Sequence, residues 1–285
     1  MATRREIFKQ LEAVAGECYP EVEARQIAEM IVTTLGGISR NDLLIEPNEE
    51  LEIKDLDIVC DDLLRWRPVQ YIIGRAEFAD MELHVAEGVL IPRPETGELV
   101  DWVAREAKSG AKILDVCTGS GCIAIALRRM VQESEVWAMD ISPEALAIAR
   151  MNAEEYASDV RFVEGDALAD FDTYFEGVTF DAIVSNPPYI PASDRSLMRQ
   201  NVTEHEPHIA LFVEDSDPLV FYRAIARTGR KMLAEDGRLY FEIYESLVEE
   251  MVAMLEREGY EDIIVREDFR GKPRMICARV SSTVR

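Results

Sequence analysis

The chain has 285 residues, of which 48% are hydrophobic, so it can bury a substantial core and is not expected to be disordered. Its formal net charge of −24 repels phosphate backbones and its few basic runs are isolated, which argues against a direct nucleic-acid partner. The five cysteines contain no CxxC pair and no apolar run approaches the roughly 20 residues of a membrane span, so we expect a cytoplasmic protein with reduced thiols and no membrane partner.

Residues 1–75 are predicted to form a small helical bundle. Apolar side chains recur at helical spacing in "EIFKQLEAVA", "EVEARQIAEMIVTTL" and "LEIKDLDIVCDDLLRW", and Gly36-Gly37 ends the second of these stretches. The stripes are expected to form the core of the bundle. We place a domain boundary after residue 75.

The period changes over residues 76–91. The stretch "EFADMELHVAEGVLIP" alternates polar and apolar residues, and Ala79-Asp80 can form a turn. These features predict a short β-hairpin that links two domains.

Residues 92–285 are predicted to form a second domain of alternating strands and helices. The predicted strands are Lys112–Val116, Glu135–Asp140, Val160–Glu164, Phe180–Ser185, Arg238–Ile243, Asp262–Glu267 and Met275–Val280. The predicted helices between them are Cys122–Val131, Pro143–Tyr156, Pro218–Leu233 and Ser246–Glu258. Parallel strands need crossover connections, so this order predicts an α/β fold with a mostly parallel, seven-stranded sheet. The last two strands have no helix between them, which permits an antiparallel final strand.

A glycine-rich turn lies between the first strand and the first helix of this domain, in "DVCTGSGCIAIAL". Gly119 and Gly121 can adopt positive φ and bring backbone N–H groups close to a charged ligand. The third glycine of a dinucleotide fingerprint is absent, and no Lys-Ser or Lys-Thr follows as in a phosphate-binding loop. A purely structural turn would explain the same residues.

Acidic residues mark three successive strand ends. Asp140 lies 21 residues after Gly119, where a carboxylate can accept hydrogen bonds from both ribose hydroxyls, although it could also cap the next helix. With Asp115 and Asp166 it predicts an acidic rim. Such a rim disfavours a pyrophosphate cofactor and suits a sulfonium donor that carries an ammonium group and a ribose, so S-adenosylmethionine is the predicted cofactor.

The fourth strand runs directly into "NPPY". Asn186 offers an amide oxygen, and the two prolines hold the Pro187 carbonyl as a second acceptor. Two acceptors that converge on one –NH₂ group would orient its nitrogen toward a donor methyl group, which is positioning rather than general-base catalysis. Tyr189 can stack on a planar substrate group. We therefore predict Asn186, Pro187 and Tyr189 as catalytic residues, with Pro188 completing the substrate site, whereas a simple β-turn would leave these residues without a chemical role.

Taken together, "RPVQYIIGRAEF", "IPRPETGELV", "DVCTGSGCIAIAL", "VSNPPYIP" and "EPHIAL" resemble the PrmC/HemK family over nearly the whole chain. This family comprises protein-(glutamine-N5) methyltransferases, which modify the glutamine of the Gly-Gly-Gln motif in peptide chain release factors. The resemblance implies a helical bundle, a hairpin and a seven-stranded S-adenosylmethionine-dependent methyltransferase domain of Rossmann-like type. It also implies release factors as partners and the helical bundle as their docking domain.

The resemblance assigns roles to individual positions. Cys117-Thr118-Gly119-Ser120-Gly121 would wrap the methionine part of the donor, Asp140 would hold the ribose, and Asp166-Ala167 would lie beside the adenine. Asn186 would touch both donor and substrate, and Asn186 through Tyr189 would grip the glutamine amide. Two positions depart from the family pattern: Cys117 stands where glycine is more usual, and Gly97 where an acid is common.

Competing functions use the same residues. A DNA or RNA amino-methyltransferase shares the "NPPY" clamp, but the acidic charge opposes it. A ribosomal-protein glutamine methyltransferase would share the clamp as well, and a non-catalytic protein could bind S-adenosylmethionine through the same turn. The run Glu204-His205-Glu206-Pro207-His208 lies on a predicted loop and shows no third ligand, so no metal site is expected.

Overall fold

The structure is a computed structural model that describes residues 2–156 and 159–281. Contacts divide the chain into two compact units. Unit 1 comprises Met1–Arg75 together with Met198–His205, and unit 2 comprises Ala76–Leu197 together with Glu206–Arg285. The sequence did not indicate that residues 198–205 belong with the N-terminal unit.

Unit 1 is a helical bundle with one short strand pair. Its helices are α1 (Arg4–Ala15), α2 (Glu21–Leu35), α3 (Arg40–Ile45), α4 (Leu56–Leu64), α5 (Val69–Ile73) and α9 (Gln200–His205), and its strands are β1 (Ala2–Thr3) and β2 (Glu50–Leu51). The apolar stripes of α1, α2 and α4 form its core, with Leu11, Ile31 and Leu63 fully buried. The predicted bundle is therefore confirmed.

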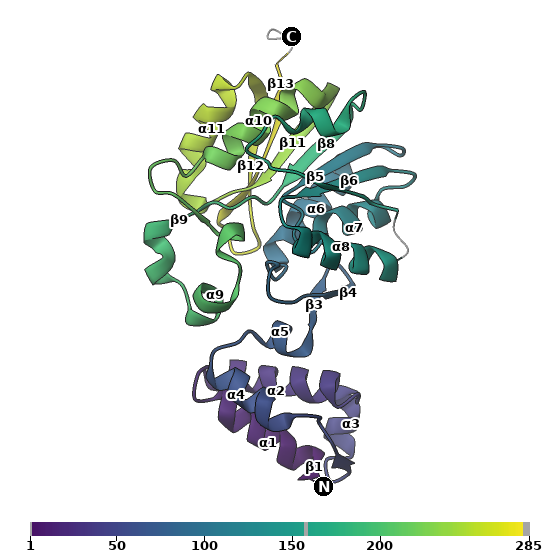
Figure 1. Cartoon of the computed structure of the whole chain (residues 1–285), viewed down its shortest axis with the longest axis vertical. Coiled ribbons are helices and arrows are strands. Elements are labelled where there is room, and N and C mark those ends of the chain that lie inside the picture. The colour runs from purple at the N-terminus through teal and green to yellow at the C-terminus, as the bar shows by residue number, and fades with distance from the viewer. Residues whose placement is uncertain (1, 157–158, 282–285) are drawn as a thin grey trace. The chain divides into compact units, whose positions relative to one another are not determined.

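Unit 2 contains a seven-stranded sheet. Its strands are β5 (Lys112–Val116), β6 (Glu135–Asp140), β7 (Arg161–Glu164), β8 (Phe180–Ser185), β11 (Leu233–Glu242), β12 (Tyr260–Glu267) and β13 (Pro273–Val280). They lie in the order β12-β13-β11-β8-β5-β6-β7, with β13 antiparallel to both of its neighbours and the pairs from β11 to β7 parallel. The predicted α/β fold with an antiparallel final strand is confirmed (Figure 1).

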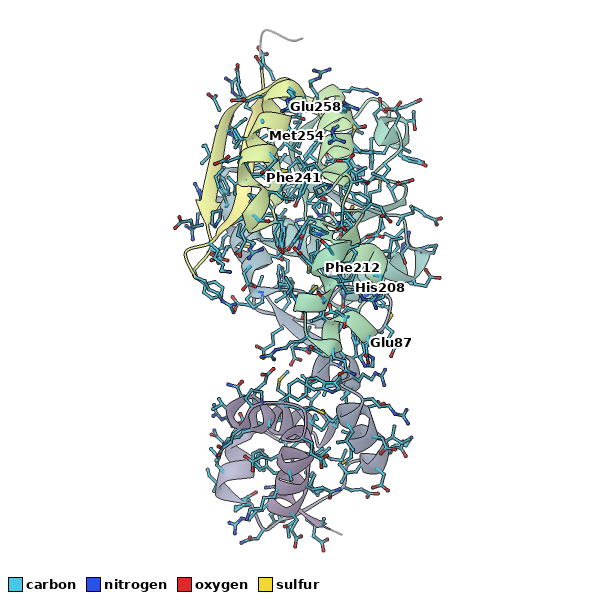
Figure 2. All side chains as sticks on the ribbon, turned by 90° about the vertical axis from the view of Figure 1, so that its left-hand side faces the viewer. Glu87, His208, Phe212, Phe241, Met254 and Glu258 are labelled. Atoms are coloured by element: carbon cyan, nitrogen blue, oxygen red, sulfur yellow. The ribbon has the colours of Figure 1, made fainter. Side chains whose placement is uncertain are left out.

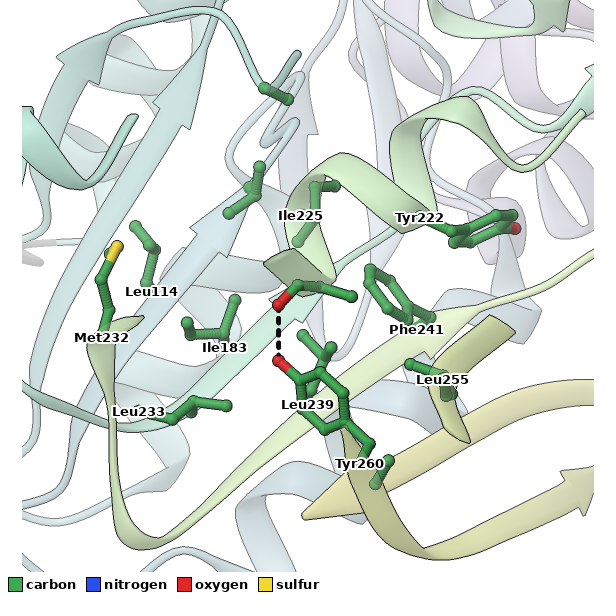
Figure 3. Close-up of a cluster of buried hydrophobic side chains, with 14 of the residues drawn as sticks. Leu114, Ile183, Tyr222, Ile225, Met232, Leu233, Leu239, Phe241, Leu255 and Tyr260 are labelled. Atoms are coloured by element: carbon green, nitrogen blue, oxygen red, sulfur yellow. Dashed lines mark hydrogen bonds between the residues drawn. The ribbon is translucent and has the colours of Figure 1, made fainter. Parts of the chain in front are cut away.

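Helices cover both faces of this sheet (Figure 1). They are α6 (Pro94–Glu106), α7 (Cys122–Met130) and α8 (Pro143–Glu155) on one face, and α10 (Val220–Met232) and α11 (Val248–Arg257) on the other. Each face therefore has its own hydrophobic core. Figure 3 shows the core on the face covered by α10 and α11, where Leu114, Ile183 and Phe241 pack with side chains of α10. In this core the Tyr260 hydroxyl donates to the Ala226 carbonyl at 2.8 Å. Alternate strand residues point to opposite faces, so strands such as β5, β8 and β11 contribute to both cores.

Some predicted boundaries were wrong. The hairpin is shorter than residues 76–91: β3 (Arg75–Phe78) pairs with β4 (Met81–His84), and its apolar side chains are buried in the core of unit 2. Strand β11 starts at Leu233 rather than Arg238 because its register with β8 shifts between these two residues, which leaves room for the "AEDG" segment. Because "AEDG" is typical of a turn, the sequence did not predict that the strand begins before it.

The chain between β8 and α10 was not predicted in detail. It contains β9 (Ile190–Pro191) parallel to β10 (Phe212–Val213), and the 3₁₀ turns η2 (Ala192–Leu197) and η3 (His208–Ala210). Two further 3₁₀ turns are η1 (Phe171–Phe175) and η4 (Glu245–Leu247). None of the helices formed by the described residues is long and apolar enough to cross a membrane.

Candidate functional site

The glycine-rich turn joins β5 to α7 through three residues with positive φ. These are Cys117 at 63°, Gly119 at 56° and Gly121 at 80°. The turn is fastened to the end of β6, because the Thr118 N–H donates to the Met139 carbonyl at 3.0 Å and the Gly119 N–H donates to Asp140 Oδ2 at 2.8 Å. A non-glycine residue at a φ of 63° stores backbone strain, and here it lies beside a cavity.

A cavity of about 320 Å³ opens at the carboxyl ends of the parallel strands. The predicted site residues that line it are Cys117, Gly119, Asp140, Asp166, Ala167, Asn186 and Pro188. Apolar residues from loops, from η3 and from α10 complete its walls, among them Val89, Ile141, Ile209 and Phe221. The position agrees with the general rule that open α/β sheets bind ligands beyond the carboxyl ends of their strands.

The wall formed by η3 is held in place by an aromatic contact. The His208 and Phe212 rings meet edge to face with centroids 5.5 Å apart (Figure 2). Ile209 and Ala210, which line the cavity, lie between these two residues in the sequence. His208 therefore packs against an aromatic ring in the stretch first considered for metal binding.

Two of the three predicted acids lie on the cavity wall. Asp140 accepts hydrogen bonds from the N–H groups of Gly119 and Ser142 at 2.8 and 2.9 Å, and burial raises its pKa. Asp166 accepts from the Leu168 N–H at 2.8 Å. Asp140 thus holds both the glycine-rich turn and the loop after β6, and Asp166 holds the loop after β7. Both residues also line the cavity.

Asp115 has a different position from the one predicted. It is fully buried beneath the turn, where the Thr118 hydroxyl donates to its Oδ2 at 2.5 Å, and it is not among the described residues that line the cavity. Burial raises its pKa to about 7. Thr118 and Ser120 are buried as well, and Gly121 lies against Ala149 of α8. These residues support the turn from behind.

The Asn-Pro-Pro corner follows β8 directly. Its base is anchored by the Ser185 hydroxyl, which donates to the Val116 carbonyl at 2.6 Å. The Asn186 side chain is half-buried, and its Nδ2 donates to Thr96 Oγ1 at 3.2 Å. The amide oxygen of Asn186 is therefore the end of the side chain that is not bonded to Thr96.

Tyr189 is directed away from the cavity in this structure. Its hydroxyl donates to Glu242 Oε1 at 3.0 Å, and its ring stacks on Tyr244 at a centroid distance of 5.9 Å. Pro187 and Pro188 are buried, and Pro188 reaches the cavity wall. The structure thus brings Asn186 and Pro188 to the cavity with the donor-side residues, whereas Pro187 and Tyr189, also predicted as catalytic, are not among the described residues that line it.

Sequence reasoning assigned no role to several polar residues around this corner. Thr96 and Glu242 are buried and bonded to each other, with a Thr96 Oγ1 to Glu242 Oε2 distance of 2.6 Å. Glu206 is also buried and binds Arg93 Nη2 at 2.6 Å. The available signal was an acid inside the apolar strand "RLYFEI", because a buried charge needs partners.

Comparisons with known proteins agree with this geometry. A family model described as a methyltransferase domain matches residues 113–208. The chain is 41% identical to the release factor glutamine methyltransferase of Bacteroides thetaiotaomicron over 92% of this chain and 95% of that protein. It is 38% identical to the protein of the same name from Flavobacterium psychrophilum, over 90% and 92% of the two chains.

A solved structure shows the same fold. The 16S rRNA N2 G1207 methyltransferase of Thermus thermophilus, in complex with AdoMet and guanosine, is 18% identical with a TM-score of 0.53. The match covers 72% of this chain and 49% of that one. At this identity the likeness concerns the fold alone.

Proposed function

The chain belongs to the family of release factor glutamine methyltransferases, and from this premise we propose that it methylates the side-chain amide nitrogen (N5) of the glutamine in the Gly-Gly-Gln motif of peptide chain release factors. The observation that carries the proposal is the orientation of Asn186. Its amide nitrogen is bound to Thr96, so its oxygen is left for a substrate –NH₂ group beside the cavity.

S-adenosylmethionine is the methyl donor, and the residues of the cavity fit it. The walls are largely apolar, as an adenine ring requires, and carry the carboxylates of Asp140 and Asp166. No Lys or Arg occurs among the described residues that line the cavity, so nothing there matches a pyrophosphate. We propose that Asp140 holds the ribose hydroxyls and that the Cys117–Gly121 turn wraps the methionine part.

The Asn-Pro-Pro corner acts on the substrate amide by orientation. The bound donor supplies a methyl group on a positively charged sulfur. We propose that Asn186 Oδ1 and the Pro187 carbonyl accept the two hydrogens of the glutamine –NH₂, which turns the nitrogen lone pair toward that methyl group. No strong base is required, because the nitrogen becomes acidic only as the new N–C bond forms, and its proton then passes to water.

A direct test uses purified protein, radiolabelled S-adenosylmethionine and an intact bacterial release factor. We expect label in the factor and a methyl group on the glutamine of its Gly-Gly-Gln motif by mass spectrometry. The matched control is the same factor with that glutamine replaced by glutamate, which should stay unlabelled. Absence of label in the intact factor, or preferential labelling of RNA or of a ribosomal protein, would contradict the proposal.

We also propose that residues 1–75 form the docking domain for the factor, in a cytoplasmic protein. Two observations support docking: this region has its own core, and α3 exposes Leu44 and Ile45 with 64% and 77% of their surfaces accessible. The free thiols of all five cysteines support the location. Replacing Leu44 and Ile45 with serine should raise the KM for the intact factor without weakening binding of S-adenosylhomocysteine; an unchanged KM would argue against docking at α3.

A further inference from the structure

A buried polar chain links three elements that are distant in the sequence. It runs from Asn186, at the end of β8, to Thr96 on α6 and then to Glu242 at the end of β11. Asn186 and Thr96 are 90 residues apart, and Thr96 and Glu242 are 146 apart. Both Thr96 and Glu242 are about 2% exposed, so water does not compete for the bond between them.

The hydrogen-bond chemistry of the three groups fixes their directions. An ionised carboxylate only accepts, so Thr96 must donate its single hydroxyl proton to Glu242 Oε2 over the 2.6 Å contact. The Thr96 oxygen then has only lone pairs to offer Asn186. Only the –NH₂ end of the Asn186 amide can bond to it, as the 3.2 Å distance from Nδ2 to Thr96 Oγ1 records.

The other carboxylate oxygen is also occupied. Tyr189 donates to Glu242 Oε1 at 3.0 Å, so one carboxylate holds both Tyr189 and, through Thr96, Asn186. The pKa of Glu242 is raised, chiefly by burial, although the hydrogen bonds from Thr96 and Tyr189 and the charge of Arg274 oppose the rise. A buried charge with two donors and a nearby cation is well suited to hold its partners in fixed directions.

We infer that Thr96 and Glu242 are positioning residues for the methyl transfer: they hold the Asn186 amide with its oxygen toward the substrate and prevent it from turning over. This inference rests on the proposed function. If the amide turned by 180°, its –NH₂ would face the substrate –NH₂, and two donors would oppose each other. Thr96 and Glu242 themselves act through Asn186 and are not assigned contact with the substrate.

The first test compares Thr96→Val with Thr96→Ser. Valine keeps the shape of threonine but removes the hydroxyl, whereas serine keeps it. We expect Thr96→Val to lower kcat about 10- to 100-fold with little change in S-adenosylhomocysteine affinity, and Thr96→Ser to restore most of the lost rate. Thr228→Val removes another buried threonine hydroxyl, on α10, and controls for loss of stability. Equal losses in Thr96→Ser and Thr96→Val would overturn the inference.

A double-mutant cycle then separates positioning from a general structural role. If Thr96 acts only through Asn186, the Thr96→Val change should cost no further rate in an Asn186→Ala background, measured under single-turnover conditions. Additive losses would overturn the inference. Glu242→Gln supplies a second variant, because its –NH₂ can donate to Thr96 and release the constraint; we expect a partial loss of kcat, and an unchanged kcat would overturn the inference.

A third measurement does not depend on the substrate. The side-chain –NH₂ resonance of Asn186, assigned by its loss in Asn186→Ala, should be protected from solvent exchange in the unmodified protein and in Thr96→Ser. It should lose this protection in Thr96→Val, and equal protection in all three would overturn the inference. If the enzyme labelled no release factor while this pattern held, the proposed function would fail and the orientation of Asn186 would stand.

Discussion

The glycine-rich turn and the Asn-Pro-Pro corner lie on the same cavity but are built differently. The turn is a contiguous stretch, Cys117–Gly121, and its shape comes from backbone angles and from N–H groups bonded to the next strand. The corner takes its orientation from side chains on α6 and β11. The donor side is therefore encoded locally, whereas the substrate side depends on the tertiary fold.

This contrast predicts different responses to substitution. Changes in the turn should alter donor binding or stability through the backbone, whereas changes at the corner should alter the rate while leaving donor binding intact. Four predictions test it.

The largest effect is expected for Asn186→Ala. Removing one of two acceptors for the substrate amide should lower kcat by about 10²- to 10³-fold, the loss found when a single transition-state hydrogen-bond group is removed. S-adenosylhomocysteine affinity, measured by calorimetry, should stay within a few-fold. If S-adenosylhomocysteine affinity fell as much as kcat, Asn186 would act mainly on the donor, and the distinction between the two sides of the cavity would be wrong.

Asp140→Ala should act on the donor instead. The substitution removes a carboxylate that faces the cavity and also releases the Gly119 N–H. Loss of hydrogen bonds to a charged group is worth about 1.5–3 kcal/mol, so S-adenosylhomocysteine should bind roughly 10- to 100-fold more weakly. When S-adenosylmethionine is saturating, the Asp140→Ala variant should retain most of the original kcat. A low kcat under these conditions would show that Asp140 does not act through donor binding alone.

The two glycines of the turn should differ in their sensitivity. A Cβ at Gly121 would lie 3.1 Å from Ala149 Cβ and from Ile125 Cδ1, whereas a Cβ at Gly119 would meet nothing within 4 Å. Both positions have positive φ, which costs about 1–2 kcal/mol for a non-glycine residue. Denaturant unfolding should therefore show a larger loss of stability for Gly121→Ala than for Gly119→Ala; equal losses would show that backbone strain alone decides.

The smallest effect is expected for Tyr189→Phe. It removes one hydrogen bond to Glu242 and keeps the ring, so the free energy of unfolding should fall by about 1 kcal/mol and kcat by less than 10-fold. Tyr189→Ala removes the ring as well and serves as the reference. If kcat falls equally in the two variants, the hydroxyl of Tyr189 is the group that supports the rate. If kcat falls only in the alanine variant, the result supports the predicted stacking of the ring on the substrate.

The same contrast explains how far the sequence could be interpreted. Strands β5, β6 and β8 were predicted residue for residue, because each is a largely apolar run that is followed directly by a turn. The positive φ of Gly119 and Gly121 followed from glycine itself. The contacts of Thr96 and Glu242 could not be derived in this way, since no local pattern specifies a partner 146 residues away.

The position of Asp115 marks the same limit. Its position at a strand end suggested an acid on the rim of the site, but a strand residue points to one side of the sheet or the other according to register. In the structure it packs behind the turn with Thr118. The sequence shows that an acid lies near the end of this strand. The side of the sheet to which its carboxylate points is set by the pairing of β5 with β6 and β8.

The chain passes through unit 1 twice, which bears on any truncation of its N-terminal part. The segment leaves unit 2 at Leu197, shortly after the "NPPY" stretch, contributes α9 to unit 1, and returns at Glu206, whose carboxylate binds Arg93 just before α6. Within unit 1 this segment is held by a 2.8 Å ion pair from Arg199 to Glu23 and by His205 on the Arg65 carbonyl. A chain without residues 1–75 would therefore also lack Glu23 and Arg65, the partners of this segment, so truncation would remove more than a binding surface.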